Sequence, residues 1–516
     1  MITFLFRTML QQDYCSGDDD ILPLKSTIKR NMDTNDYETS CQISVDNSQK
    51  ILGTLKNLYE ERQMCDVVIT VGQKEYTAHR LILCASSDVF QAMLMKPEWS
   101  EWHESKIALQ ELPQCEAVFH LFLEYFYTGK IVITHTNVMP ILALADKYMV
   151  KSLTQVCIKY MSKHIAHAAS HNQLFSWLQY TTTCGYDNVA NLCQNYIKWN
   201  FESVANTPDF SNFETDLLCD LLKQSDIVVY NEMVLYNCVV RWLDLQEIRY
   251  NQMKLSDTEM QELMVNIVQC VMKCIRFPMM SPRELADLLL SPLMKRYSQS
   301  MLEYMAVGML FQKGRSDEID NFCSTDKGRI LCTPRLYTCD TFNTTLLIEN
   351  VPSIPSYNVT TLVFSTRMSA AEYEADKISE WVVDLYPKGV CFKKCYLIVW
   401  QGTLEVPERV KSTIRLSLTC REFKEDMKCN VGVLLYGTQG GIEHIMQVKQ
   451  RVHHFNSQYP VLVIDNLIPF EELNPPAGEV FSRSLESDPK PKSMFLTGCR
   501  RDQLKINIII TPVFSN

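Results

Sequence analysis

The chain has 516 residues, of which 46% are hydrophobic and 21% charged, and its formal net charge is −10. A chain of this length exceeds what one hydrophobic core supports, so we expect about three or four domains. The acidic balance argues against nucleic-acid binding and against attachment to anionic membranes, because both require clustered Lys and Arg side chains that neutralise phosphates.

The 20 cysteines fall mostly at apolar positions, for example Cys84, Cys193 and Cys238. Buried thiols are common in proteins, and no C-x-x-C pair indicates a zinc ribbon or a thioredoxin-like site. The apolar run at residues 2–6 is too short for a signal peptide, and no stretch approaches the roughly 18 apolar residues of a membrane span. We therefore expect reduced thiols in a soluble cytoplasmic protein, with the nucleus as a possible location.

Residues 1–45 are polar and acidic and are predicted to form a disordered arm. Residues 46–163 then alternate between helical and strand periods. The predicted elements are a helix at 49–61, strands at 66–71 and 75–79, a helix capped by Ser86 or Ser87, a strand at 105–112, a helix at 119–127 ended by Gly129, a strand at 130–134 and a helix at 141–149. They predict a compact α+β domain.

Residues 164–312 have an almost entirely helical period and predict an all-α array. A polar linker is expected at 313–335. Beyond it the hydrophobic period falls from 3.6 to 2: Ile414, Leu416 and Leu418 alternate with polar residues. About seven or eight such strands predict an antiparallel β-sandwich over residues 336–516, which makes the whole chain a multidomain α+β protein.

Several motifs resemble known domains. Asp66, Ala78-His79-Arg80, Ser86, Phe90, Tyr127-Thr128-Gly129 and Ala145-Asp146-Lys147-Tyr148 occur in the order and spacing of a BTB/POZ domain. The segments LLCDLLKQSDIVVYNEMVLYNCVVRWLD and IRFPMMSPRELADLL are similar to the BACK helical repeat. The segment WVVDLYPKGV is similar to TRAF-like (MATH) sandwiches. This domain order resembles the group called BTB/POZ domain-containing protein 17.

The BTB resemblance implies a structural role for Asp66 and His79. In that fold both side chains are largely buried and tie a strand to the start of a helix, where buried polar groups need partners. No nucleophile with a neighbouring acid lies nearby in sequence, so we expect a structural clasp and not a catalytic dyad. Accordingly we expect no enzyme activity and no cofactor.

The resemblance also implies two interaction surfaces. BTB domains commonly form homodimers through the N-terminal helix, here with Ile51, Leu52, Leu55 and Leu58; the alternative is that these residues only pack on their own domain. Many BTB–BACK proteins bind cullin-3 through a hydrophobic-x-Glu element, which Trp99-Ser100-Glu101 matches, although methionine or leucine is more usual at the first position. Alternatively, Trp99 and Trp102 pack locally.

Two groups of histidines could be mistaken for sites. His164, His167 and His171 share one helical face, and imidazoles at this spacing can bind zinc. No fourth ligand accompanies them, so we expect an exposed polar helix face and no metal site. His453 and His454 are expected on the solvated face of a strand.

Taken together, these features predict a substrate adaptor of a cullin-3-type ubiquitin ligase, with a homodimeric BTB domain and a sandwich that binds an unidentified client protein. Trp381, Tyr386, Tyr396 and Trp400 are candidates for the client groove. One alternative is an oligomeric scaffold or transcriptional cofactor without ligase activity. Another is a secreted glycoprotein with paired cysteines.

Overall fold

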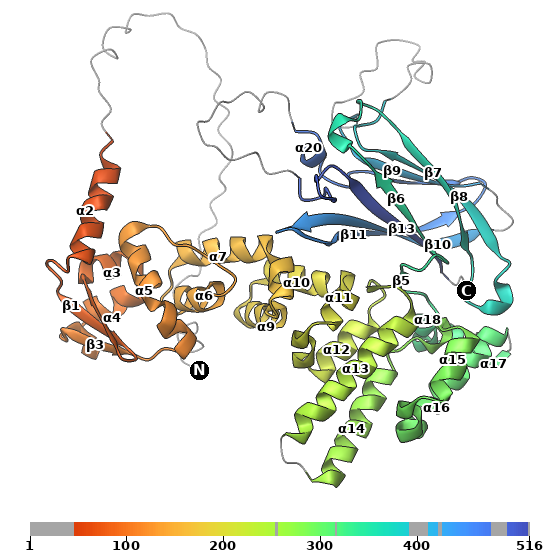
Figure 1. The fold of residues 1–516 in the computed structure, drawn as a ribbon, viewed down its shortest axis with the longest axis horizontal. Helices are drawn as coiled ribbons and strands as arrows, with labels where there is room; N and C mark the ends of the chain where they lie inside the picture. Colours follow the sequence, from red (N-terminus) through yellow and green to blue (C-terminus); the bar gives the residue numbers. More distant parts are fainter. Residues whose placement is uncertain are drawn as a thin grey trace, which may run out of the picture. The chain divides into compact units, whose positions relative to one another are not determined.

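The computed structural model describes residues 46–252, 256–314, 317–391, 411–421, 426–475 and 493–513 (Figure 1). The predicted arm at 1–45, the strand expected at 395–400, and the groove candidates Tyr396 and Trp400 lie outside these ranges. The chain divides into two compact units, Met1–Met161 and Ser162–Asn516. Within the described ranges, no helix combines the length and the apolar character needed to cross a membrane.

The first unit is a three-stranded sheet with helices packed against it. Its elements are α2 (Ser48–Glu60), β1 (Val67–Val71), β2 (Lys74–Ala78), α3 (Arg80–Ser86), α4 (Asp88–Met95), η2 (Ser100–Trp102), β3 (Lys106–Leu109), α5 (Pro113–Thr128), α6 (Val138–Lys147) and α7 (Lys151–Lys163). The sheet order is β2-β1-β3, with β1 antiparallel to β2 and parallel to β3. The predicted α+β fold is confirmed.

Local sequence signals explain where these elements begin and end. The side chain of Ser87 accepts a hydrogen bond from the Phe90 backbone N–H and caps α4. Pro113 opens α5, and Gly129 ends it in the left-handed region at φ 62°. The core between α4, α5 and α6 is aromatic: the rings of Phe90 and Tyr148 stack with centroids 4.6 Å apart.

The strand predicted at residues 130–134 is wrong. These residues form no regular structure, and the side chain of Val132 is 76% exposed. Among the described residues of this unit the sheet consists of β1, β2 and β3, so this segment has no neighbouring strand there. A β-branched segment without a ladder partner does not become a strand, whatever its propensity.

The second unit begins with a series of helices. They are α8 (Ile165–Ser170), α9 (Leu174–Cys184), α10 (Asp187–Trp199), α11 (Phe201–Ala205), η3 (Pro208–Asn212), α12 (Thr215–Lys223), α13 (Glu232–Asn251), α14 (Asp257–Met272), η4 (Phe277–Met279), α15 (Pro282–Leu289) and α16 (Pro292–Lys313). Ser256 and Ser281 each form a complete capping box with the glutamate three residues later. The predicted helical array is confirmed.

The sandwich follows, and its described residues form two four-stranded sheets. Its elements are β6 (Asn343–Ile348), η5 (Val351–Ser353), β7 (Thr360–Arg367), η6 (Glu372–Glu374), β8 (Ile378–Tyr386), β9 (Arg415–Cys420), β10 (Met427–Gln439), β11 (Ile442–Phe455), β12 (Val461–Ile464), α20 (Phe470–Leu473) and β13 (Leu504–Pro512). We call β11-β10-β13-β6 the inner sheet and β12-β9-β8-β7 the outer sheet. All pairings are antiparallel, which confirms the predicted sandwich.

The two central strands of the inner sheet, β10 and β13, are buried on both faces over most of their length. One face carries Val431, Val433 and Ile508 into the core between the sheets. On the other face, Leu434 and Ile509 are fully buried although they do not belong to that core. A Cβ atom added to Gly432 on this second face would lie 2.6 Å from the Leu336 side chain, so a glycine permits the close approach.

The helical array covers one end of the inner sheet. Asn200 follows α10; its Oδ1 accepts from the backbone N–H of Ile445 in β11 at 2.9 Å, and its Nδ2 donates to the Ile445 carbonyl at 3.2 Å. The ring of Tyr196 lies 5.1 Å from that of His444. Figure 1 shows the sandwich beside the helices of this unit. The sandwich and the helical array therefore share packed surfaces.

The segment predicted as a linker at 313–335 contains two further helices, α17 (Asp317–Ser324) and α18 (Asp326–Leu331). After them, β5 (Leu336–Tyr337) pairs with β4 (Val228–Val229) from the helical array in a short parallel ladder. Leu331, Cys332 and Leu336 are buried. The polar and apolar residues of this segment follow neither a clear helical period nor a clear strand period, so the sequence alone suggested a linker.

A fully buried ionic network lies beside β5. Arg335 Nε donates to Glu232 Oε2 at 3.1 Å, and both side chains are 0% exposed. Glu232 also accepts from the Arg276 backbone N–H and from the Tyr337 hydroxyl, at 2.8 and 2.6 Å. Burial alone would raise the pKa of Glu232, but Arg335, Arg276 and these hydrogen bonds together lower it. The carboxylate is therefore ionised and neutralises part of the buried positive charge.

Candidate interaction surfaces

His79 contacts residues from two other segments of the first unit. Its backbone N–H donates to the Tyr127 hydroxyl at 3.0 Å, and its Nε2 lies 2.8 Å from the Gln63 carbonyl oxygen. Because a carbonyl oxygen only accepts, Nε2 carries the proton, and Nδ1 accepts from the Tyr127 hydroxyl at 3.0 Å. His79 is half-buried, and these contacts suit a structural role at the start of α3.

Asp66 is exposed, so the expectation that this aspartate is largely buried is wrong. It lies just before β1, next to a run of exposed residues at 61–64. Its Oδ1 still accepts a hydrogen bond from the Arg80 backbone N–H at 2.8 Å, at the first turn of α3. The contact between strand and helix is thus present without burial of the carboxylate.

Arg80 holds the loop that follows α4. Its guanidinium donates to backbone carbonyl oxygens on both sides of that loop, those of Leu94, Glu101, Trp102 and Glu104. Five donors in a rigid planar fork suit this task. No role was predicted for Arg80 from the sequence, although it stands directly after His79 in the BTB motif.

Trp99 and Glu101 lie in the loop that Arg80 holds. Trp99 is the N-cap of the short helix η2, and both side chains are half-buried. Glu101 Oε2 accepts a hydrogen bond from the hydroxyl of the neighbouring Ser100 at 2.8 Å. This bond is local and does not tie the carboxylate to another element of the unit. Trp102 is 36% exposed and packs against the His103 ring at 3.9 Å.

Helix α2 has no buried residue. Of the four residues predicted to form the dimer surface, Ile51 and Leu52 are exposed, and Leu55 and Leu58 are half-buried. The helix is attached to its own unit through Tyr59, whose ring stacks on that of Tyr127 with centroids 4.4 Å apart. Burial raises the pKa of Tyr59 to about 12. The helix thus packs through one side and leaves apolar side chains uncovered on another.

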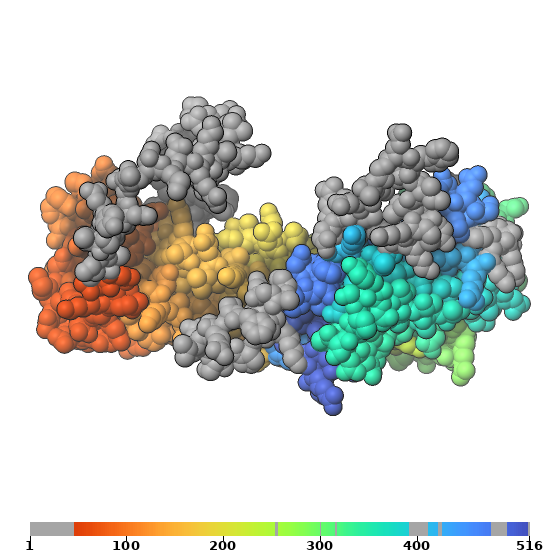
Figure 2. Space-filling model, turned by 90° about the horizontal axis from the view of Figure 1, so that it is seen from above, coloured from red at the N-terminus to blue at the C-terminus, as the bar shows by residue number. Residues whose placement is uncertain are grey.

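In the sandwich, the structure separates the two described groove candidates. Trp381 is fully buried in the core, and its Nε1 donates to Thr366 Oγ1 at 2.8 Å, so it cannot line a surface groove. Tyr386 is half-buried at the end of β8. The teal part of the colour scale, which includes β7, forms part of the visible surface in Figure 2.

The edge strand β12 exposes apolar side chains, and this exposure was not predicted from the sequence. It pairs with β9 alone, so its other edge is unpaired by any described strand. Val461 and Val463 point to the exposed side, whereas Leu462 and Ile464 enter the core. The continuous apolar run Val461-Leu462-Val463-Ile464 hid this alternation. Arg415 and Asp465 form an ion pair beside it at 2.6 Å.

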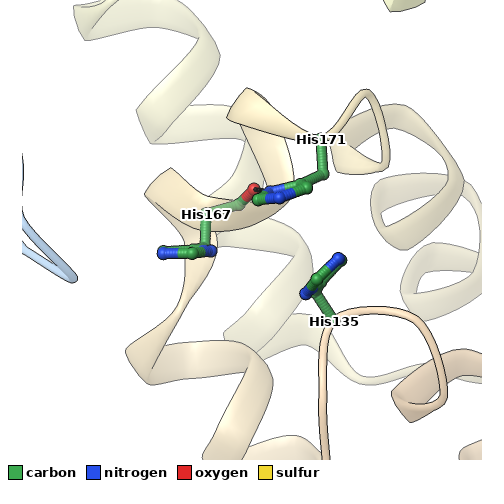
Figure 3. A group of neighbouring side chains, drawn as sticks. All are labelled: His135, His167 and His171. Atoms are coloured by element: carbon green, nitrogen blue, oxygen red, sulfur yellow. Dashed lines mark hydrogen bonds between the residues drawn. The ribbon is translucent and has the colours of Figure 1, made fainter.

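Figure 3 shows the histidines of α8. The rings of His167 and His171 are nearly parallel, with centroids 5.2 Å apart. A Cβ atom added to Gly440 in the β10–β11 turn would lie 2.7 Å from the His167 ring, so His167 packs against the sandwich. His135, also drawn there, belongs to the first unit. The helix face predicted to be exposed is therefore partly covered at His167.

Comparisons with known protein families agree with this architecture. A BTB/POZ domain model matches residues 55–165, a BACK (BTB And C-terminal Kelch) model matches 174–290, and a BTBD17 TRAF domain model matches 332–514. The chain has the domain order BTB/POZ, BACK and BTBD17 TRAF. The resemblance derived from the sequence motifs is confirmed.

Full-length relatives show the same relationship. BTB/POZ domain-containing protein 17 of Xenopus laevis is 24% identical over 353 residues, which are 67% of this chain and 69% of the relative. The Homo sapiens protein of that name is 25% identical over 352 residues, 67% of each chain. Kelch repeat and BTB domain-containing protein 8 of Homo sapiens is 28% identical over 232 residues, 45% of this chain and 35% of the relative.

BTB, BACK and TRAF domains are typically interaction modules without catalytic activity. The surfaces described above are of the kind such modules use: an apolar helix face, a loop with an aromatic and a carboxylate, and a sheet edge. A protein-interaction role is therefore the general assignment for this chain.

Proposed function

We propose that the chain is a dimeric substrate adaptor of a cullin-3-type ubiquitin ligase. The BTB domain recruits the cullin through Trp99 and Glu101 and dimerises through α2, and the sandwich binds a client protein. The observation that carries the proposal is the loop of residues 95–105, because Arg80 binds its backbone carbonyls and leaves Trp99 and Glu101 at the surface of a rigid support.

Pre-ordering of this loop favours binding. An anchor that is already held in place loses less conformational entropy when a partner binds. The indole of Trp99 supplies apolar area for a pocket, and the carboxylate of Glu101 can accept hydrogen bonds from the partner. The proposal requires that the cullin offers an apolar pocket next to hydrogen-bond donors.

The uncovered face of α2 supports dimerisation. The side chains of Ile51 and Leu52 are 62% and 41% exposed, which gives α2 an apolar face that no described residue of its unit covers. Burying such a face against a second copy stabilises the pair by roughly 25 cal/mol per Å² of apolar area. A dimer would present two cullin sites and two client sites, which raises the avidity of the assembled ligase.

For the client we propose an extended segment that adds a strand to the free edge of β12. Unpaired backbone groups on an edge strand form a ready template for another strand. Val461 and Val463 would contact alternate apolar side chains of the client, and the Arg415–Asp465 pair would supply a polar contact beside them.

Pull-down of cullin-3 with the full chain tests the adaptor role. Wild-type protein should bind, and the double variant Trp99→Ala/Glu101→Ala should lose most of that binding. Trp102→Ala is the matched control, since this neighbouring exposed tryptophan lies outside the hydrophobic-x-Glu element. If the wild-type chain does not bind the cullin, the adaptor proposal is wrong and a scaffold without ligase activity takes its place.

Sedimentation velocity tests the dimer separately. Ile51→Asp/Leu52→Asp should convert the protein to a monomer, because two carboxylates would be buried without partners. Asn57→Asp, an exposed polar position on the other side of the same helix, is the control and should leave the dimer intact. A wild-type chain that sediments as a monomer would contradict this part of the proposal without bearing on cullin binding.

A further inference from the structure

Two cysteines that take no part in these surfaces lie next to each other in the segment after α16. Cys323 is near the end of α17, and Cys332 is the C-cap of α18. Their Sγ atoms are 3.2 Å apart. Since a disulfide bond measures about 2.0 Å, the two sulfur atoms need to approach by only roughly one ångström to bond.

The turn between the two helices brings the sulfurs together. Thr325 caps α18 by accepting a hydrogen bond from the Gly328 backbone N–H at 3.0 Å. A Cβ atom on Gly328 would overlap the carbonyl oxygen of Phe322, so only glycine permits α18 to pack this closely against the end of α17. The proximity of the thiols is therefore a consequence of the backbone path.

The two thiols differ in their access to solvent. Cys323 is half-buried and lines a cavity of ≈ 40 Å³ together with Phe311, Ile319, Ser369, Tyr373 and Glu374. A cavity needs about 10–15 Å³ to hold one water molecule, so this one has room for a small polar reagent. Cys332 is 0% exposed and belongs to a cluster with Phe311, Ile319 and Ala371. A reagent in the cavity would meet Cys323 first.

We propose that Cys323 and Cys332 form a redox modification site, at which a small hydroperoxide oxidises the two thiols reversibly to a disulfide. The sulfur of Cys323 attacks one peroxide oxygen; the O–O bond breaks, and the other oxygen leaves as an alcohol, or as water for hydrogen peroxide. This step converts Cys323 to a sulfenic acid. Cys332 then attacks that sulfur, an S–S bond forms, the S–O bond breaks, and the hydroxyl group leaves as water with the thiol proton.

The atoms and electrons of this oxidation balance. Two thiols and one hydroperoxide give one disulfide, one alcohol or water, and one further water; the sulfurs lose two electrons and the peroxide gains them. A dithiol in the reduced protein restores both cysteines by exchange. The adjacent buried thiol protects Cys323, since rapid disulfide formation prevents oxidation to the irreversible sulfinic acid.

A disulfide bond between Cys323 and Cys332 would stabilise the segment that connects the helical array to the sandwich. The cavity is lined by Phe311 of α16 on one side and by Ser369 and Tyr373 of the sandwich on the other. A disulfide between α17 and the end of α18 would restrict local opening of this segment. Oxidation should therefore slow proteolysis within residues 317–332.

The experiment uses the full chain, treated with hydrogen peroxide at neutral pH, alkylated, digested without reduction and analysed by mass spectrometry. Peptides that carry Cys323 and Cys332 should appear cross-linked with the loss of two hydrogen atoms, and dithiothreitol should reverse this. Cys323→Ser and Cys332→Ser should each abolish the cross-link. Cys499→Ser, which removes an exposed thiol elsewhere, should leave its yield unchanged.

A second variant tests the geometry. Gly328→Ala keeps both thiols but forces the turn apart, so it should lower the yield of the cross-link severalfold. In Cys332→Ser, Cys323 should instead accumulate as sulfenic and sulfinic acid. The proposal is overturned if Cys323 in the wild-type chain is oxidised to sulfinic acid without a cross-link, or if Cys323 pairs with another cysteine.

Discussion

The two sheets of the sandwich have the same number of described strands but differ in what covers them. In the inner sheet, β13 runs through Ile508, Ile509 and Ile510, all of which are buried. In the outer sheet, β8 alternates strictly, with Trp381, Val383 and Leu385 buried and the residues between them half-exposed. The central strands β10 and β13 of the inner sheet are packed between the outer sheet and other parts of the unit, whereas one face of β7 and β8 in the outer sheet is exposed or half-exposed among the described residues.

This difference indicates how the second unit is organised. A sandwich that functioned alone would need only one buried face on each sheet. Here the inner sheet needs the helical array and β5 for its second face, so the helices and the sandwich depend on each other. The client site that we propose lies at the edge of the outer sheet, at β12.

The largest expected effect comes from breaking the buried network that joins β5 to the helical array. Glu232→Gln removes the charge that neutralises Arg276 and Arg335, and we expect a loss of about 3–5 kcal/mol in the free energy of unfolding. Urea denaturation measures this loss. Glu247→Gln, which breaks the exposed pair with Arg296, should cost only about 0–1 kcal/mol. Equal losses of stability in the two variants would contradict the view that the buried network joins β5 to the helical array.

A direct comparison of the sheets comes next. Ile509→Ala leaves a cavity on the covered face of the inner sheet and should cost about 2–5 kcal/mol. Val363→Ala, at an exposed position of β7, should change the stability by no more than about 0.5 kcal/mol. Thermal or chemical denaturation of the two variants measures these losses of stability. A large loss with Val363→Ala would mean that the outer sheet is covered as well.

A smaller effect is expected at the contact between α10 and β11. Asn200→Ala removes two hydrogen bonds to Ile445 and leaves its backbone groups without these partners, at a cost of about 1–3 kcal/mol. Hydrogen exchange should show faster exchange of the Ile445 amide and its neighbours, with little change in the outer sheet. Thr361→Ala on β7 is a matched control, since its hydroxyl bonds only to Asp384 within the outer sheet.

The smallest expected effect is a dependence on pH. Burial lowers the pKa of His444 below its ordinary value of 6.5, so the unfolded chain takes up a proton more readily than the folded one. The stability linked to this residue is present above pH 6.5 and is lost as the pH falls below that value. His444→Gln should flatten this part of the stability profile. An unchanged slope would assign the pH dependence to other groups.

Local signals in the sequence predicted much of the fold. Ser87, Gly129 and Ser281 mark helix ends because caps satisfy backbone groups that the helix leaves unpaired. Period-2 patterns located β7, β8 and β9, since one face of each strand enters the core. The strand β6 was missed because its pattern, Asn343 to Ile348, begins with polar residues that read as a turn.

The interaction surfaces were less predictable. Trp99, Glu101 and the residues of α2 were singled out by resemblance, and their roles stay predictions. The support that Arg80 gives to the loop, the exposure of Val461 and Val463, and the proximity of Cys323 to Cys332 all depend on contacts between residues whose relation a linear pattern does not display.

What the sequence determined by itself is the identity of the domains and most of their elements, because hydrophobic period and capping act over a few neighbouring residues. What only the tertiary structure decided is which faces are covered. The burial of Ile509, the pairing of β4 with β5, and the neutralisation of Glu232 by Arg335 join residues far apart in the chain. Such contacts follow from how the elements pack, and no local pattern specifies them.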